Sequence, residues 1–250
     1  MNAIAASKHD LNGLTLQQAS STMKGLGILS LEEGLVSTRH VVHTTQGKVI
    51  GEWGIRKWGR SDVKTSPKRT NVHIARQSLL LALLEQLGGF DAVQWGHQLM
   101  DFKVREDETV DLSFQIEGKG KGEIKHAKAD LVVGADGIRS SVRSLLIGED
   151  ASPLKYLGCI VILGICPLAD IETPNRSLLD SATVFQTANG NERIYIMPYA
   201  SDSVMWQLSF PMSEKEAKAL SAQGAQALKE ESCRRCQWHD PIPQILAATQ

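Results

Sequence analysis

The stretch that decides the fold is residues 129–143, which read ADLVVGADGIRSSVR. It opens with an apolar run, Leu131–Val133, that is bounded by charge on one side and by glycine on the other. That pattern is typical of a buried strand in a parallel sheet. A glycine-rich turn follows, in which Gly137 suits a positive φ. Ser140 or Ser141 is placed to cap a helix after the turn. The stretch therefore predicts a strand, a turn and a helix.

Asp136 is the residue of this stretch that is best suited to contact a ligand. It would lie at the carboxyl end of the predicted strand, beside a helix N-terminus, which is where ligands bind in open α/β sheets. A carboxylate there accepts hydrogen bonds from the hydroxyl groups of a ligand. An ordinary strand–turn–helix without a ligand is the alternative interpretation of the same residues.

The composition is that of an ordinary globular protein, with 42% hydrophobic and 22% charged residues in a chain of 250. The net charge of −1 indicates neither a nucleic acid nor a membrane surface as partner. The sequence contains neither a secretory start nor an apolar run long enough to span a membrane. Four cysteines indicate no disulfide framework, so we expect a reducing, cytoplasmic location.

The clearest predicted helix covers residues 73–87, where leucines form a wide apolar stripe that ends at Gly88-Gly89. Arg76 lies in its first turn, where the helix dipole disfavours a cation. An anionic ligand at this helix end would explain the arginine, because free amides there bind phosphate. A surface arginine lying over apolar neighbours is the alternative.

The remaining pattern predicts a mixed α/β fold with many antiparallel strands. Alternation places Ile194 and Ile196 on one face of a sheet, with Tyr195 and Met197 on the other. The predicted elements are a hairpin at 39–53, a meander at 93–105, 109–117 and 122–127, strands at 156–166, 182–188, 192–198 and 203–210, and helices at 213–233 and 243–249.

The helix that contains Arg76 and the later stretch that contains Asp136 resemble two motifs of the flavin-dependent aromatic hydroxylases. These are the single-component FAD monooxygenases built like para-hydroxybenzoate hydroxylase. Arg76, Leu79 and Leu83 match the pattern R-x-x-L-x-x-x-L of that family. Residues 130–143 match its pattern D-x-x-x-G-A-D-G-x-x-S-x-V-R. The similarity in order extends over nearly the whole chain.

The resemblance implies a fold and a set of site residues. Residues 1–150 would form an incomplete FAD/NAD(P)-binding, Rossmann-like domain with a meander and a hairpin excursion at 39–72. Residues 151–250 would form a β-sheet-rich substrate domain. Arg76, Asp136 and Gly137 would bind FAD. Four residues on one face of the second sheet would line the substrate site, although ordinary sheet packing also accounts for each: Gln186, Tyr195, Met197 and Gln207.

The resemblance also implies a reaction. NAD(P)H would reduce FAD, dioxygen would be captured as a flavin hydroperoxide, and one oxygen atom would pass to an aromatic or similar small organic substrate. The cofactor carries the difficult chemistry in such enzymes, so we assign no catalytic residue. The chain lacks the G-x-G-x-x-G turn and the terminal G-D motif of the family, so we expect an internal portion, truncated at both ends.

Other interpretations stay open. The chain could be a non-catalytic remnant that acts as a binding or interaction module, or a flavin reductase or halogenase of the same superfamily. Cys233, Cys236 and His239 have metal-like spacing, but a structural zinc site needs four ligands. We therefore expect no metal site.

Overall fold

A computed structural model describes residues 13–16, 19–54, 71–117, 122–173 and 176–249. The fold is mixed α/β, as the sequence predicts. The described residues form two compact units, one from within 1–87 and 158–250 and the other from 88–157. The assignment of an FAD-binding role to 1–150 and a substrate role to 151–250 stays a prediction. Residues 55–70 of the predicted excursion lie outside the described residues.

The larger unit contains two sheets and five α-helices in its described part. Its strands are β1 (Gly13–Leu16), β2 (Leu35–Ser37), β3 (Arg39–His43), β4 (Val49–Trp53), β5 (Asn71–Ala75), β9 (Cys159–Pro167), β10 (Thr183–Ala188), β11 (Arg193–Ala200) and β12 (Ser203–Pro211). Its α-helices are α1 (Ser20–Gly25), α2 (Arg76–Gln86), α4 (Glu214–Ala222), α5 (Ala225–Arg235) and α6 (Ile242–Ala248).

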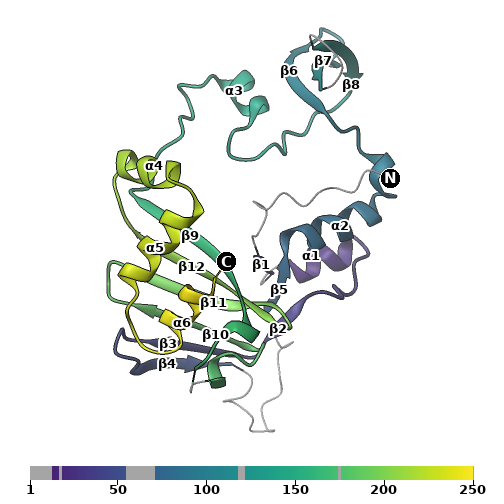
Figure 1. Ribbon diagram of the computed structural model, residues 1–250. Helices are drawn as coiled ribbons and strands as arrows, with labels where there is room; N and C mark the ends of the chain where they lie inside the picture. Colours follow the sequence, from purple (N-terminus) through teal and green to yellow (C-terminus); the bar gives the residue numbers. More distant parts are fainter. Residues whose placement is uncertain (1–12, 17–18, 55–70, 118–121, 174–175, 250) are drawn as a thin grey trace. The chain divides into compact units, whose positions relative to one another are not determined.

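The main sheet has six strands in the order β4-β3-β10-β11-β12-β9 (Figure 1). The predicted hairpin of β3 and β4 is confirmed, and it joins the later strands because β3 pairs with β10 in parallel. One face of the sheet packs against α5 and α6 in the main hydrophobic core. Trp206 is buried there, and its indole N–H donates to Thr249 Oγ1 at 2.8 Å.

The opposite face of the main sheet packs in part against a small sheet of order β1-β5-β2. Val184, Met197 and Met205 are buried on this face. The Gly13 N–H of β1 donates to Met205 Sδ at 3.1 Å, which joins the two sheets. The predicted alternation along β11 is confirmed, because Ile194 and Ile196 are buried in the other face.

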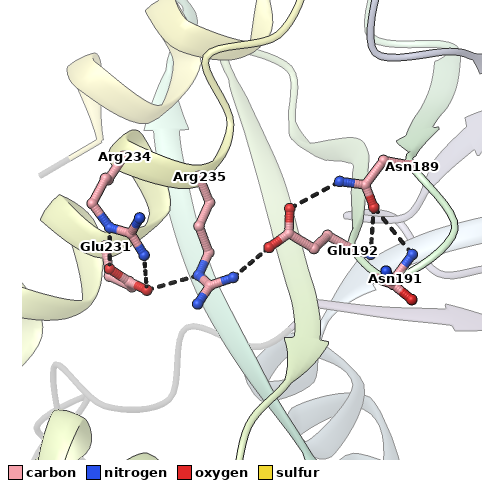
Figure 2. Close-up of polar contacts among 6 residues, drawn as sticks. All are labelled: Asn189, Asn191, Glu192, Glu231, Arg234 and Arg235. Carbon is pink, nitrogen blue, oxygen red and sulfur yellow. Dashed lines mark hydrogen bonds and ion pairs between the residues drawn. The ribbon is translucent and has the colours of Figure 1, made fainter.

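A polar network ties α5 to the turn between β10 and β11 (Figure 2). Arg234 and Arg235 both donate to Glu231, with Nε distances of 2.8 and 2.7 Å. Arg235 also pairs with Glu192, whose carboxylate accepts from Asn189 Nδ2 at 3.0 Å. These hydrogen bonds hold the pKa of the Glu231 carboxyl at about 2, chiefly through Arg234 and also through Arg235.

The smaller unit confirms the predicted meander and the predicted helix. Its strands β6 (His97–Val104), β7 (Val110–Ile116) and β8 (Glu123–Ala129) form an antiparallel sheet. Its helix α3 spans Ser141–Ile147 and follows the turn at Gly137. Ser140 is the cap, because its hydroxyl accepts a hydrogen bond from the Arg143 N–H at 3.0 Å.

The buried strand predicted at residues 131–133 is wrong. The backbone of 131–137 forms no strand, and Leu131 and Val133 are 78% and 76% exposed. An apolar run becomes a strand only when neighbouring strands take up its backbone hydrogen bonds. The described residues supply no strand that pairs with this run.

The helix predicted at 73–87 begins later than expected, at Arg76. Residues Asn71–Ala75 are instead strand β5, which pairs with both β1 and β2. His73 and Ile74 are both buried there. Pairing with strands from earlier in the chain decides this segment, and local periodicity cannot reveal such pairing.

Candidate functional site

Arg76 is the first residue of α2, and it stands where an anion would be favoured. The helix starts without a side-chain cap, because Ala75 at the N-cap is extended and carries no hydrogen-bonding group. The first turn contains no acidic residue. Arg76 is exposed, and none of the ion pairs found among the described residues includes it. The guanidinium and the first-turn amides therefore present positive charge to solvent.

Short contacts link the start of α2 to one face of the main sheet. Ala75, the residue before Arg76, pairs with Gly13 across β5 and β1. The Gly13 N–H reaches Met205 Sδ on β12 at 3.1 Å. Gln207 is two residues further along β12, so its side chain is on the same face as Met205. The predicted FAD-binding arginine thus begins a helix next to the sheet face that carries the predicted substrate residues.

Three of the predicted substrate residues form one row across the sheet. Gln186 on β10 pairs with Tyr195 on β11, and Tyr195 pairs with Gln207 on β12. All three side chains are half-buried. Burial raises the pKa of the Tyr195 hydroxyl, although the nearby Arg193 opposes the change. The row therefore presents neutral hydrogen-bond donors and acceptors at physiological pH.

Met197 differs from the other three predicted residues. It is 4% exposed and packs with Val184 and Met205 under the small sheet. The hydroxyl of Thr15 on β1 donates to Met197 Sδ at 3.7 Å. A substrate-lining role for Met197 stays a prediction, but its contacts are those of the core between the two sheets.

A polar cluster that the sequence does not predict lies beside this face. His73 is 1% exposed, and its Nδ1 lies 3.0 Å from Thr15 Oγ1. Burial, aided by the nearby His40, lowers the pKa of His73 to about 4. His40 Nε2 in turn lies 3.2 Å from Asn71 Nδ2. The alternation of polar and apolar residues in NVHIA is the one local signal that could have placed His73 in a strand.

Asp136 and Gly137 lie in the smaller unit, beside the start of α3. The Val142 N–H donates to Asp136 Oδ2 at 3.2 Å. Hydrogen bonds from Ser140 and then Val142 lower the pKa of the Asp136 carboxyl, so it is ionised. Gly137 has φ 77°, and a Cβ there would meet nothing within 4 Å. Asp136 thus has the expected place at a helix N-terminus, while its role in FAD binding stays a prediction.

A shallow groove of about 380 Å³ runs past Asp136 in the smaller unit. Its wall is largely apolar and includes Leu99, Phe114 and Val133. Such a groove accepts a flat apolar group whose polar end reaches the Asp136 carboxylate.

Cys236 and His239 take part in the internal contacts of the larger unit. Cys236 is fully buried, and burial raises the pKa of its thiol to about 12. His239 Nε2 is already occupied by Thr187 Oγ1, at 2.8 Å. Across the described ranges, no group of three or more His, Cys, Asp or Glu residues could hold a metal ion.

Comparison with known proteins finds similarity to FAD-dependent monooxygenases along almost the whole chain. The monooxygenase cfoF of Aspergillus candidus is 25% identical over 248 residues, which is 96% of this chain and 57% of cfoF. HpxO of Klebsiella pneumoniae, solved with FAD and uric acid, has a TM-score of 0.70 at 18% identity, over 94% of this chain and 55% of HpxO. No family model matches the chain.

Other solved structures share the fold. The 2,6-dihydroxypyridine-3-hydroxylase of Arthrobacter nicotinovorans has a TM-score of 0.72 at 14% identity, over 96% of this chain and 60% of the hydroxylase. PqsL of Pseudomonas aeruginosa, a probable FAD-dependent monooxygenase, has a TM-score of 0.66 at 20% identity, over 97% of this chain and 61% of PqsL. The chain thus resembles FAD-dependent monooxygenases and spans 57% of the length of its curated relative. No helix of the described residues has the length and apolar character needed to cross a membrane.

Proposed function

We propose that this chain is the part of an FAD-dependent monooxygenase that binds the anionic portion of FAD and faces the substrate. The observation that carries the proposal lies within the larger unit. A helix start that attracts anions, at Arg76, adjoins a sheet face with a row of neutral polar side chains. Both features are needed to hold a charged cofactor beside a small organic molecule.

Residues of each unit, taken separately, fit a part of FAD. The uncapped start of α2 and the exposed guanidinium of Arg76 suit a pyrophosphate group. The ionised Asp136 carboxylate has about four lone-pair sites, so besides Ser140 and Val142 it can accept from a ribityl or ribose hydroxyl. The open space around Gly137 lets a ligand approach the backbone. Bound FAD supplies the redox chemistry, taking electrons from NAD(P)H and activating dioxygen.

The protein then has to bind, orient and keep dry a small organic substrate. Gln186 and Gln207 can donate to and accept from ring hydroxyl, carbonyl and ring nitrogen groups. Tyr195 lies between them in the row and offers a hydroxyl and an aromatic edge. Because none of the three is charged, the row suits a neutral polar ring better than a carboxylate. We infer a hydroxylated or oxo-substituted heteroaromatic substrate, the class to which uric acid and 2,6-dihydroxypyridine belong.

A substrate panel tests this function. NAD(P)H oxidation and oxygen uptake are measured with FAD-loaded protein, alone and with uric acid, 2,6-dihydroxypyridine or a simple phenol. We expect one heteroaromatic compound to accelerate oxidation and to gain one oxygen atom. Oxidation that proceeds equally well without any ring compound contradicts the monooxygenase proposal and identifies a flavin reductase. FAD-loaded protein that never oxidises NAD(P)H would favour a non-catalytic binding module over an enzyme.

A substitution in the row of Gln186, Tyr195 and Gln207 tests whether this sheet face binds the substrate. Gln207→Leu removes one hydrogen bond to the substrate, so we expect KM to rise about tenfold at unchanged FAD affinity. Gln223→Leu, an exposed residue that follows α4, is the matched control and should leave KM unchanged. An unchanged KM in Gln207→Leu would remove this face from the substrate site.

A further inference from the structure

Among the described residues, strand β9 is one unpaired edge of the main sheet, and β4 is the other (Figure 1). β9 has nine residues, CIVILGICP, and none is charged. Its register with β12 runs from end to end without a bulge. Edge strands are normally shielded by charge, by proline, by a bulge or by being short. The only proline of β9 is its last residue, so the edge is open to pairing with another strand.

The hydrogen bonds that flank β9 show which of its backbone groups face β12. The Met212 N–H donates to the Gly158 carbonyl at 3.1 Å, just before the strand. The Leu168 N–H donates to the Asp202 carbonyl at 2.7 Å, just after it. Both pairs continue the register of β9 with β12. Since hydrogen-bonded pairs alternate along an antiparallel ladder, the even-numbered residues of β9 bond to β12.

The odd-numbered residues therefore direct their N–H and C=O groups to the open edge. Pro167, which has no N–H, belongs to this odd set and so leaves no gap in the ladder with β12. The outward N–H groups belong to Cys159, Val161, Leu163 and Ile165. Val161 and Leu163 also have exposed side chains, 51% and 41% accessible.

We propose that β9 pairs with β9 of a second copy, antiparallel about a two-fold axis at Ile162. Cys159 then faces Ile165 of the other copy, and Val161 faces Leu163, so every outward N–H meets a carbonyl. An axis at Leu163 would instead set Pro167 against Cys159 and leave a carbonyl without a donor. A second copy fits because the edge is self-complementary: the backbone pattern closes on itself, and no side chain brings a like charge opposite its own copy.

The pairing is expected to be reversible. A single ladder of this length buries less than the roughly 1,200–2,000 Å² of a stable protein interface. We therefore expect weak association, with a mixture of monomer and dimer whose proportions change with protein concentration.

Sedimentation velocity of the full chain between about 1 and 200 µM tests the proposal. We expect dimer to grow with concentration in the natural sequence. The double variant Val161→Lys/Leu163→Lys sets lysine against lysine in the proposed register, and should weaken association at least about tenfold. The matched control is Ile50→Lys on the opposite edge, at β4, which should leave the dissociation constant unchanged.

A charge-rescue experiment separates loss of pairing from any disturbance of the strand by the double lysine variant. Val161→Glu/Leu163→Glu should also be monomeric, and an equal mixture with the lysine variant should restore a dimer. Natural protein that stays monomeric up to about 200 µM overturns the proposal and points to another segment or protein as the occupant of the edge. Dimer that survives both lysines, or a mixture that stays monomeric, also overturns it.

Discussion

Burial of His73 predicts that the protein loses stability in weak acid. The pKa of this imidazole falls from the ordinary 6.5 to about 4 in the folded chain. Because the pKa of this histidine is lower in the folded chain, the unfolded chain binds more protons than the folded chain at pH values between the unfolded and folded pKa values. The free energy of unfolding therefore falls as pH falls from 6.5, and levels off below about 4.

The size of the effect follows from the shift. One pKa unit corresponds to about 1.4 kcal/mol, so the change from 6.5 to about 4 amounts to about 3 kcal/mol. That is a large part of the roughly 5–15 kcal/mol that stabilises a typical domain. His40 and His43 add to the loss in the same direction, because burial lowers their pKa values too.

The variant His73→Asn isolates the contribution of His73. Asparagine keeps a polar atom near Thr15 but does not titrate, so the pH-dependent loss should shrink by about 3 kcal/mol. Urea unfolding, followed by circular dichroism at a series of pH values from neutral to about 4, measures this loss. His126→Asn, at an exposed position of β8, is the matched control for the change of histidine to asparagine. If His73→Asn keeps the full pH dependence, His73 is not the buried titrating group.

Three further predictions concern the cofactor, the helix network and the core. Arg76→Gln should weaken FAD binding about tenfold or more in a flavin-fluorescence titration, and Arg76→Lys should have an intermediate affinity. Lys218→Gln on α4 should keep the natural affinity for FAD, and equal affinity in all variants would exclude Arg76 from the site. Glu231→Gln should lower the free energy of unfolding in urea by about 1–2 kcal/mol at neutral pH. Because the folded chain lowers the pKa of this carboxyl from 4.5 to about 2, the loss should vanish as pH falls from 4.5 towards 2, and a loss that persists at pH 2 would contradict the ion pairing. Gly164→Ala should lower the free energy of unfolding by about 2 kcal/mol, because the new Cβ would overlap the indole of Trp206. Gly25→Ala, with no atom within 4 Å of the new Cβ, should be neutral or stabilising, and equal urea midpoints for the two variants would contradict the packing.

The sequence predicts the elements whose pattern is local. The meander, the β3–β4 hairpin and the strands β9 to β12 follow from alternation and turn residues. It does not predict the parallel pairing of β3 with β10, because that contact joins residues far apart in the chain. The 131–133 run fails for a related reason. Its apolar character indicates a strand, but a strand exists only where a partner strand is present.

The candidate site is predictable to a similar extent. Arg76 is singled out by charge, since a cation in a first helical turn needs a reason, and the structure adds that the helix is uncapped. The row of Gln186, Tyr195 and Gln207 needs the register of three strands, which alternation alone does not supply. Thr15 and His73 carry no sequence signal that joins them, because their contact depends on the pairing of β1 with β5.

We propose that this chain itself contributes an FAD site. Gel filtration of the purified chain after incubation with FAD tests it most directly, with Arg76→Gln run in parallel. We expect a yellow protein peak with flavin absorbance in the natural sequence and a marked loss of that absorbance in the variant. A colourless protein peak, with all flavin eluting as free FAD, would contradict it.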